Sequence, residues 1–321
     1  MRRTANFVLS TGLVLASLAV SLGVGELVLR LKNSSMTNYD IEMWRYSKEL
    51  KAPSPDPALD FDHVRSKSAT LENVEIRLNE QGLRGGPIAP LAPGERRILF
   101  LGGSITLGWG VPEDQTVEAQ LAKLLAAGGE KAEVLNGGVG NYNTERYVSR
   151  FFRELVDLHP TDIVVQYFLR DAEKLPPGGG NVFLRNSELA VTLWIAYHRL
   201  FDKLGEASLV EHYQNVYRET APGFVEMKAQ IEKLARYAKQ NGIRIYLAMT
   251  PDVHNLTNYP FGAIHETMKQ IARQNGYVYI DLLPALAGHS SQELWAMPGD
   301  PHPNALGQRL MASEIFEVLK K

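Results

Sequence analysis

The pattern of apolar and polar positions divides the chain into three regions. After the opening "MRR", no charged residue occurs before Glu26, and Leu, Val, Ala and Ser dominate this stretch. Turn-forming segments such as "APSPDPALDFD" and "GGPIAPLAPGE" follow, and short apolar runs then alternate with longer amphipathic stretches. We therefore predict a cytoplasmic tip and membrane anchor at residues 1–30, a stalk and irregular lead-in at 31–95, and a folded domain at 96–321.

Within the folded domain, five apolar runs predict five β-strands. They are "RILFLG", "AEVLNGG", "DIVVQYFL", "IRIYLAMT" and "YVYIDLL". Continuous apolar runs are typical of strands that are buried on both faces, as in a parallel sheet. Amphipathic stretches between the strands predict helices at 116–129, 143–160, 222–242 and 263–276. This alternation predicts a three-layer α/β domain, with the aromatic-rich stretch 186–220 as a helical insertion.

The uncharged N-terminal stretch matches a membrane-spanning helix in length. About 20 residues at a rise of about 1.5 Å cover the roughly 30 Å of bilayer hydrocarbon. The alternative is a cleaved signal peptide, but no A-x-A-like cleavage site follows and "GELVLRLKN" continues the helical pattern. We predict an uncleaved anchor through residues 7–29. Arg2 and Arg3 then favour a cytoplasmic amino end, a single pass through the inner membrane and an extracytoplasmic domain.

Composition narrows the chemistry that the domain can perform. The formal net charge of −2 gives no electrostatic reason to expect nucleic-acid binding. The chain has no cysteine, which excludes disulfides, thiolate metal sites and cysteine nucleophiles. No metal-ligand spacing and no cofactor-binding motif is found, so we predict neither a metal nor a cofactor.

The segment "ILFLGGSITLGWG" at residues 98–110 contains the first candidate for catalysis. Ligands of an open α/β sheet bind at the carboxyl ends of its strands, where this segment turns. The two glycines allow a sharp turn that leaves the side chain of Ser104 exposed. A serine hydroxyl becomes an effective nucleophile only when a neighbouring base accepts its proton.

The best candidate for that base lies in "GDPHPNALGQRL". Proline at 301 and 303 favours extended backbone at Asp300 and His302, so that the two side chains lie on one side and the carboxylate can orient the imidazole. Asn304 is predicted to cap the final helix, whose positive end would keep His302 neutral and basic. The alternative is a helix-capping loop in which the histidine has no catalytic role.

Four segments in this order resemble the sequence blocks of the SGNH (GDSL-type) hydrolases. They are "GGSIT", "NGGVGNYNT", "YFLRDAE" and "DPHPNALG", and "LNEQGLRGG" resembles the lead-in of membrane-anchored members. The resemblance covers roughly residues 96–321 and implies a flavodoxin-like five-stranded sheet. It also implies that Ser104 attacks an ester, that His302 acts as base and then acid, and that Asp300 orients His302. The implied oxyanion donors are the N–H groups of Ser104 and Gly140, with Gly138 as the alternative.

The sequence departs from the family pattern at three places. Gly103 replaces a usual aspartate, and the histidine block reads D-x-H instead of D-x-x-H. Arg170 occupies the place of the asparagine whose side chain normally completes the oxyanion hole. Arg170 either replaces that donor, with its guanidinium turned toward the site, or pairs with Asp171 or Glu173.

Several residues are expected to line the substrate because they follow the carboxyl ends of the predicted strands. His254, in "MTPDVHNL", is either a substrate contact or second acid/base, or a loop histidine bonded to backbone. The other predicted contacts are Trp109, Asn141, Tyr142, Asn143 and Asp171.

The family resemblance and the predicted topology together favour an extracytoplasmic serine esterase or O-acyltransferase. The expected substrate is an acylated small molecule or glycan, above all an envelope or exported polysaccharide, and a membrane-embedded acyl-donor partner is possible. Hydrolase and transferase share one acyl-enzyme and differ only in the acceptor, so the sequence does not separate them. The alternative is a non-catalytic glycan-binding or scaffold subunit that retains the fold.

Overall fold

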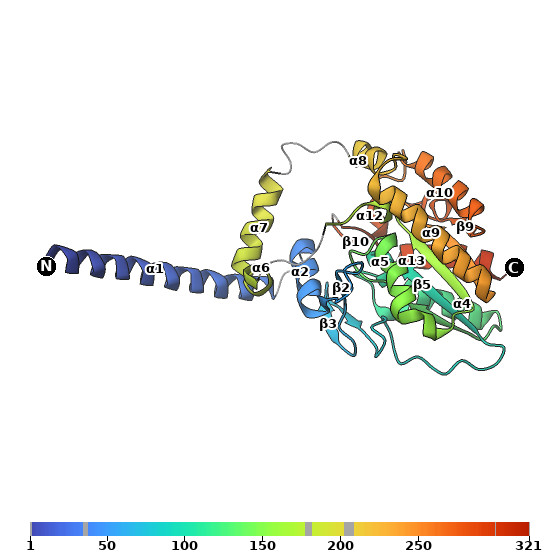
Figure 1. Cartoon of the computed structure of the whole chain (residues 1–321), viewed down its shortest axis with the longest axis horizontal. Coiled ribbons are helices and arrows are strands. Elements are labelled where there is room, and N and C mark those ends of the chain that lie inside the picture. Colours follow the sequence, from blue (N-terminus) through green and yellow to red (C-terminus); the bar gives the residue numbers. More distant parts are fainter. Residues whose placement is uncertain (1, 35–37, 177–181, 202–208, 299, 321) are drawn as a thin grey trace. The chain divides into compact units, whose positions relative to one another are not determined.

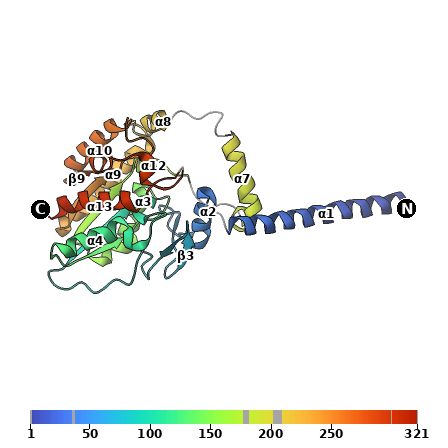
Figure 2. The same cartoon turned by 180° about the vertical axis from the view of Figure 1, so that it is seen from behind.

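The computed structural model describes residues 2–34, 38–176, 182–201, 209–298 and 300–320, and it divides into two compact units (Figures 1 and 2). The anchor unit consists of Met1–Lys48 and Gly179–Glu206, and the sheet unit consists of Glu49–Gly178 and Ala207–Lys321. The helices of the anchor unit are α1 (Arg2–Asn33), α2 (Tyr39–Glu49), α6 (Val182–Asn186) and α7 (Glu188–Phe201).

The sheet unit is built on five parallel strands in the order β6-β5-β7-β8-β9. Numbered along the chain, this is the order 2-1-3-4-5 of flavodoxin-like folds. The predicted fold class and the five predicted strands are therefore confirmed. Their bounds are β5 (Arg96–Gly102), β6 (Ala132–Asn136), β7 (Asp162–Tyr167), β8 (Arg244–Met249) and β9 (Val278–Asp281).

Helices cover both faces of this sheet, because successive side chains of each strand point to opposite sides. On β5, Leu99 and Leu101 pack with α5, α9 and α10, whereas Ile98 and Phe100 pack with α4, α11 and α13. These helices are α4 (Val117–Ala127), α5 (Thr144–Arg150), α9 (Pro222–Asn241), α10 (Gly262–Gln274), α11 (Leu283–Leu286) and α13 (Ala305–Leu319). The strands are thus buried on both faces, as their continuous apolar sequences predict.

One predicted helix is irregular at its carboxyl end. The helix expected over 143–160 is α-helical only in α5, and a π-helical turn, Phe151–Leu155, and a 3-10 turn, Val156–Leu158, complete it. The shorter elements near the carboxyl ends of the strands are α3 (Ser104–Leu107), η1 (Glu113–Gln115), η4 (Leu169–Ala172), α8 (Leu209–Val216), α12 (Ser291–Leu294), β10 (Trp295–Met297) and β11 (Asp300–Pro303).

The segment before β5 differs from the predicted irregular lead-in. It contains two antiparallel pairs, β1 (Lys51–Pro53) with β2 (Phe61–His63) and β3 (Ser68–Leu71) with β4 (Val74–Arg77). Leu59, Ile76 and Leu83 are almost completely buried, and Leu83 joins the core beside β5. The compact unit therefore begins near residue 49 rather than at residue 96, since these apolar side chains complete its core.

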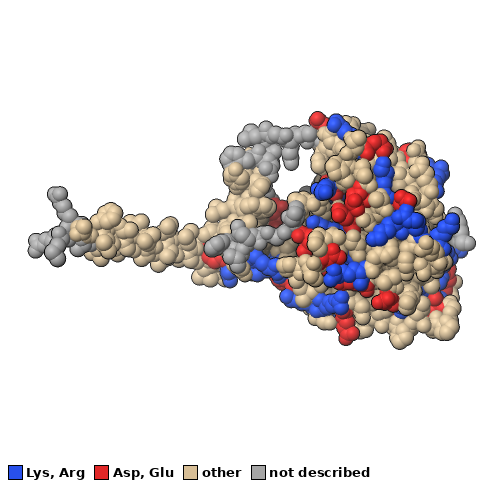
Figure 3. Space-filling view, viewed as in Figure 1, with Lys and Arg blue, Asp and Glu red and all other residues tan. Residues whose placement is uncertain are grey.

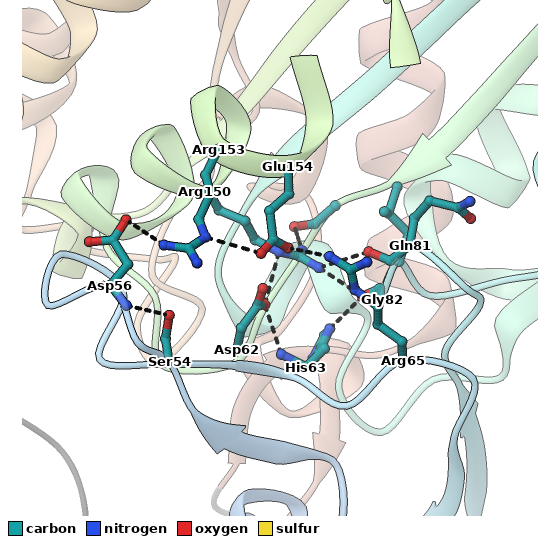
Figure 4. Close-up of polar contacts among 12 residues, drawn as sticks. Ser54, Asp56, Asp62, His63, Arg65, Gln81, Gly82, Arg150, Arg153 and Glu154 are labelled. Atoms are coloured by element: carbon teal, nitrogen blue, oxygen red, sulfur yellow. Dashed lines mark hydrogen bonds and ion pairs between the residues drawn. The ribbon is translucent and has the colours of Figure 1, made fainter. Parts of the chain in front are cut away.

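A buried guanidinium joins this segment to the sheet (Figure 4). Arg150 of α5 forms an ion pair with Asp62, with 2.9 Å between Nε and Oδ1. The same guanidinium donates to the carbonyls of Gly82 at 2.9 Å and Gly137 at 3.3 Å. His63 also contacts the Gly82 carbonyl through Nδ1 at 2.8 Å, and burial lowers the pKa of His63 to about 3. Arg150 thus links the lead-in to the loop that follows β6.

In the anchor unit, α1 has the length and apolar composition of a membrane-spanning helix over Asn6–Asn33. A signal sequence near the N-terminus has the same properties, so composition alone does not distinguish the two. Leu, Val and Phe side chains along α1 are exposed, and Figure 3 shows an uncharged surface over the described middle of this helix, with charged side chains toward its carboxyl end.

Candidate active site

Ser104 lies at the carboxyl end of β5 and begins the short helix α3. Gly102 permits this turn, because a Cβ there would stand 2.1 Å from Thr106 Oγ1 and 2.9 Å from the Gln166 carbonyl oxygen. Among the described residues, the backbone N–H of Ser104 donates to no other group. The turn therefore places both the hydroxyl and the N–H of Ser104 at the carboxyl end of the sheet.

His302 lies beside this serine, although the two are 198 residues apart in the sequence. Ser104 Oγ and His302 Nε2 are 2.7 Å apart, which is hydrogen-bond distance. His302 belongs to β11, pairs through this strand with β10, and is buried. A serine hydroxyl in contact with an imidazole nitrogen is the arrangement in which a histidine can accept the serine proton.

The cap predicted after this histidine is confirmed. Asn304 Oδ1 accepts hydrogen bonds from the N–H groups of Leu306 and Gly307 at 3.0 and 3.1 Å, at the start of α13. Its Nδ2 donates to the Glu293 carbonyl at 2.8 Å. These bonds fix the backbone next to His302 between α12 and α13.

Asp300, the third member of the predicted triad, is the first residue of β11 and pairs with Met297. Its side chain lies outside the described residues. The contact between Asp300 and His302 therefore stays a prediction from the D-x-H spacing.

The two glycines predicted as oxyanion donors differ in their surroundings. The N–H of Gly138 donates to Asn136 Oδ1 at 3.0 Å, and a Cβ on Gly138 would stand 2.2 Å from the Leu107 nitrogen. The carbonyl of Gly140 accepts a hydrogen bond from Lys51 Nζ at 3.1 Å. The amide of Gly138 therefore already has a partner within its own loop.

Lys51, which donates to the Gly140 carbonyl, forms a contact with this loop that the sequence does not predict. Its side chain is buried, and its Nζ lies 4.0 Å from the centre of the Phe61 ring. Burial, assisted by the charge of Arg146, lowers the pKa of Lys51 to about 7. No sequence signal marks this contact, because it joins the lead-in to a loop 89 residues further on.

Gln308 forms a second contact that the sequence does not predict, and it connects the segment of Ser104 with that of His302. This buried side chain of α13 donates from Nε2 to the carbonyls of Ile105 at 3.3 Å and Pro303 at 3.4 Å. Its Oε1 accepts from the N–H of Val117 at 3.0 Å. Ile105 and Pro303 are the neighbours of Ser104 and His302, so one amide holds both segments.

We expect Gln308→Met to lower the kcat of ester turnover by about 10-fold with little change in KM. Methionine fills the volume but cannot hold the two carbonyls, and small displacements of reacting groups reduce rate strongly. Gln240→Met, at an exposed position of α9, is the matched control. A Gln308→Met enzyme with the kcat of the control would show that the contact has no positioning role.

Arg170 lies in η4 after β7, and its side chain turns to Glu173. The distance between Arg170 Nε and Glu173 Oε2 is 3.1 Å, and half of the arginine side chain is exposed. His212 contacts the other carboxylate oxygen of Glu173 at 2.9 Å. The expectation that this guanidinium points toward the nucleophile is therefore not met. Asp171 is not its partner, because Asp171 is buried and accepts from the N–H of Phe168.

Burial raises the pKa of Asp171 to about 8, so this side chain is largely protonated at neutral pH. Because Arg170 pairs with Glu173 at the surface, we expect Arg170→Ala to change ester turnover by no more than about threefold. An exposed ion pair contributes only about 0–1 kcal/mol. The kcat/KM of purified Arg170→Ala and Arg170→Asn checks this. A loss of about 100-fold in the alanine variant would assign Arg170 to the oxyanion site instead.

The structure places four of the predicted substrate contacts below the surface. Trp109 is fully buried and donates from Nε1 to Glu72 Oε1 at 2.7 Å, and Tyr142 packs against the Phe61 ring. Asn143 caps α5 by accepting from the N–H of Arg146, and Asp171 is buried as described above. These side chains support the loops around the site, whereas the sequence predicts that they contact the substrate. Asn141 is half-buried and adopts a left-handed backbone conformation, with φ of 65°.

His254 is the exposed histidine of the loop after β8. Its Nδ1 lies 2.6 Å from Asp252 Oδ1, and its side chain is 45% exposed. The ring also contacts Trp295 edge to face, and Trp295 pairs with Pro303 next to His302. His254 is therefore a histidine with a carboxylate partner, close to the segment that contains His302. Within the described residues, no three His, Asp or Glu side chains are grouped to hold a metal ion.

Comparison with known proteins gives structural similarity only. No family model and no curated protein matches the sequence. A solved structure from Desulfitobacterium hafniense DCB-2, described as lipolytic and of the G-D-S-L family, is 18% identical with a TM-score of 0.42, covering 70% of this chain and 99% of that chain. The esterase EstA from Pseudoalteromonas sp. is 15% identical with a TM-score of 0.44, covering 70% and 97%.

A catalytic variant of an acetylxylan esterase from Geobacillus stearothermophilus is 17% identical with a TM-score of 0.47. This alignment covers 71% of the present chain and 95% of the esterase. The function proposed below rests on the geometry of Ser104 and His302 in this chain.

Proposed function

We propose that this chain is a membrane-anchored serine esterase or O-acyltransferase of the SGNH type. The observation that carries the proposal is the 2.7 Å contact between Ser104 Oγ and His302 Nε2 at the carboxyl end of a parallel sheet. Ser104 also has a backbone N–H without a partner among the described residues, which suits it to bind a developing oxyanion.

The proposed reaction proceeds in two steps through an acyl-enzyme. His302 Nε2 accepts the proton of Ser104 as its oxygen attacks the ester carbonyl carbon, and the N–H groups of Ser104 and Gly140 stabilise the oxyanion. The tetrahedral intermediate collapses as protonated His302 gives the proton to the leaving alcohol. Water or a sugar hydroxyl then attacks the acyl-serine with His302 again as base. Asp300 holds His302 in the required tautomer.

The proposed substrate is an acylated glycan outside the cytoplasm. The predicted anchor, with Arg2 and Arg3 before it, supports a location of the sheet unit on that side of the membrane. His254, exposed and paired with Asp252, is the side chain best placed to contact a sugar or to serve an acceptor hydroxyl. A membrane-embedded partner that supplies the acyl group would make the enzyme a transferase, whereas water as acceptor makes it an esterase.

A non-catalytic glycan-binding or scaffold subunit is the second candidate. One observation favours it, because Arg170 pairs with Glu173 and the usual asparagine donor is absent. Loss of one oxyanion donor typically lowers the rate by about 10²–10³-fold. The intact contact between Ser104 and His302 favours the enzyme, since a site that no longer catalyses has no need for it.

Turnover of p-nitrophenyl acetate by the full chain in nanodiscs tests the proposal. We expect p-nitrophenol release that saturates with substrate and is absent from the Ser104→Ala protein. Release that increases when an oligosaccharide acceptor is added, together with acylated oligosaccharide in the mass spectrum, would identify a transferase. Absence of turnover in all conditions, with glycan binding retained, would support the non-catalytic candidate instead.

The predicted topology has its own test. We expect alkaline phosphatase fused after residue 40 to be active and to sediment with membranes. The phosphatase is active only outside the cytoplasm, and α1 would anchor it in the membrane. The same fusion lacking residues 2–33 is the control for export. Active phosphatase in the soluble fraction would show that α1 is a cleaved signal sequence.

A further inference from the structure

The helix α7 presents an exposed apolar face in the anchor unit. Leu193 is 61% exposed, Trp194 49%, Tyr197 58% and Leu200 65%. Leu193 and Trp194 are adjacent, and Tyr197 and Leu200 follow at intervals of three residues. The four side chains therefore lie on one face of the helix. Val191, on another face, is buried. An exposed patch of this composition marks a surface that contacts another apolar phase.

The amino end of α7 is fixed to α1 through Glu26. The Glu26 carboxylate accepts hydrogen bonds from the hydroxyl of Ser187 at 2.8 Å and from the N–H groups of Glu188 and Leu189 at 3.1 and 2.9 Å. It also forms an ion pair with Arg30 at 2.8 Å. A carboxylate at a helix N-terminus compensates both the unpaired N–H groups and the helix dipole, so this contact orders the start of α7.

Further contacts of α7 with α1 are at the same end of the helix. Asn33 Nδ2 donates to Glu188 Oε2 at 2.6 Å, and a Cβ on Gly25 would stand 3.7 Å from Leu189 Cδ2. Beyond this junction α7 runs across the axis of α1 rather than alongside it (Figures 1 and 2). The exposed apolar face belongs to the part of α7 that leads away from α1.

The position of Glu26 along α1 indicates the depth at which this junction would lie in a membrane. The uncharged residues from Asn6 to Gly25 extend over about 30 Å at the rise of an α-helix, which is about the thickness of the hydrocarbon core. Glu26 therefore marks the outer boundary of that core if α1 spans it. A helix that starts at this boundary and runs across the spanning helix lies along the membrane surface.

We propose that α7 is a membrane-interface helix whose face Leu193, Trp194, Tyr197 and Leu200 is embedded in the lipid of the outer leaflet. The occupant of the apolar face is the bilayer itself, because α7 begins at a junction with α1, whose apolar side chains are exposed as well. Tryptophan and tyrosine are the residues enriched at this depth. Amphipathic helices of this kind insert about 5–10 Å into the headgroup and acyl boundary. The proposal rests on the proposed membrane anchoring of α1.

The consequence concerns how the sheet unit is held. The chain enters the anchor unit twice, before residue 49 and again between the third sequence block and α8. The chain therefore passes between the two units three times, at residues 48–49, 178–179 and 206–207, and the second passage follows η4. These passages tether the sheet unit to an anchor unit that both α1 and α7 would hold at the membrane.

The absence of native cysteine makes a direct test possible. Single cysteines replace Leu15 in α1, Leu193 in α7 and Val225 in α9, all of which are exposed apolar positions. Each full-length protein is labelled with the fluorophore NBD and reconstituted in phosphatidylethanolamine–phosphatidylglycerol vesicles that contain nitroxide-labelled lipid. Leu200→Cys is a second position on α7, in case Leu193→Cys folds poorly.

We expect the labels at 15, 193 and 200 to be quenched by the nitroxide lipid and shifted to shorter emission wavelength, and the label at 225 to remain as in water. If 193 and 200 behave like 225 while 15 is quenched, α1 spans the bilayer and the proposal for α7 is wrong. If 15 also behaves like 225, the anchoring of α1 fails and the proposal for α7 fails with it. Quenching at 193 but not at 225 in an inactive protein would leave the proposal standing independently of the esterase activity.

Discussion

Ester turnover falls by about 10⁴-fold or more in both Ser104→Ala and His302→Ala, and the double variant is scarcely worse than either. This expectation follows from the contact between Ser104 Oγ and His302 Nε2, since a nucleophile and its base act as one unit and the loss of either removes nearly the whole effect. Asp300→Ala should be less severe, because this residue orients the base. The measurement is kcat/KM with p-nitrophenyl acetate.

Ser313, which is exposed, and His289, which is half-buried, provide matched controls for these variants. Ser313→Ala removes a hydroxyl that donates to the Arg309 carbonyl in α13, and His289→Ala removes a histidine near Glu293. Both controls should retain wild-type turnover. Wild-type turnover in Ser104→Ala would exclude this serine as nucleophile, and equal losses in the controls would show that the effect is one of folding.

The largest expected effect on stability is that of Arg150→Met, which should destabilise the sheet unit by about 3–5 kcal/mol. Arg150 is almost completely buried, and methionine leaves the carboxylate of Asp62 without its ion pair and the carbonyls of Gly82 and Gly137 without this donor. For a unit of this size the midpoint of thermal unfolding should fall by roughly 10 °C. Circular dichroism of the full-length protein measures it.

Arg153, three residues after Arg150, serves as the control (Figure 4). Arg153 forms ion pairs with Asp56 at 3.1 Å and Glu154 at 3.4 Å, and 37% of its side chain is exposed. Arg153→Met should therefore cost at most about 1 kcal/mol, as solvent screens exposed pairs. Equal destabilisation by both substitutions would contradict the role given to the buried guanidinium.

The sheet could be predicted from sequence because its signal is local. Each strand is buried on both faces, so it appears as a continuous apolar run, and the glycines after β5 mark a turn that only small residues allow. The position of His302 could be predicted for the same reason, since its prolines and the cap at Asn304 act on neighbouring residues.

The lead-in could not be predicted, because its order depends on partners far along the chain. Asp62 pairs with Arg150, and Lys51 donates to the Gly140 carbonyl. No local sequence pattern predicts either contact. The same reason applies to Trp109. Its place after the turn at Ser104 predicts a substrate contact, but Glu72, from the connection of β3 to β4, accepts a hydrogen bond from its indole N–H in the interior. Burial of a side chain is decided by such distant partners.

Arg170 shows how a single charged residue can be predicted in two ways. The place of Arg170 after β7 was fixed by the sequence blocks, but the direction of its long side chain depended on which carboxylate stood nearby. Glu173, three residues on, supplies that partner at the surface. Whether the site is active with one fewer oxyanion donor is therefore best decided by the reactivity of Ser104.

The most direct test of the account is covalent labelling of the nucleophile. The full-length protein is treated with a fluorophosphonate, and the intact mass and the modified peptide are determined for wild type, Ser104→Ala and His302→Ala. We expect one adduct per chain, on Ser104, with none in Ser104→Ala and a much slower reaction in His302→Ala. An adduct on another residue, or an enzyme that turns over esters but whose Ser104 is never modified, would contradict the account.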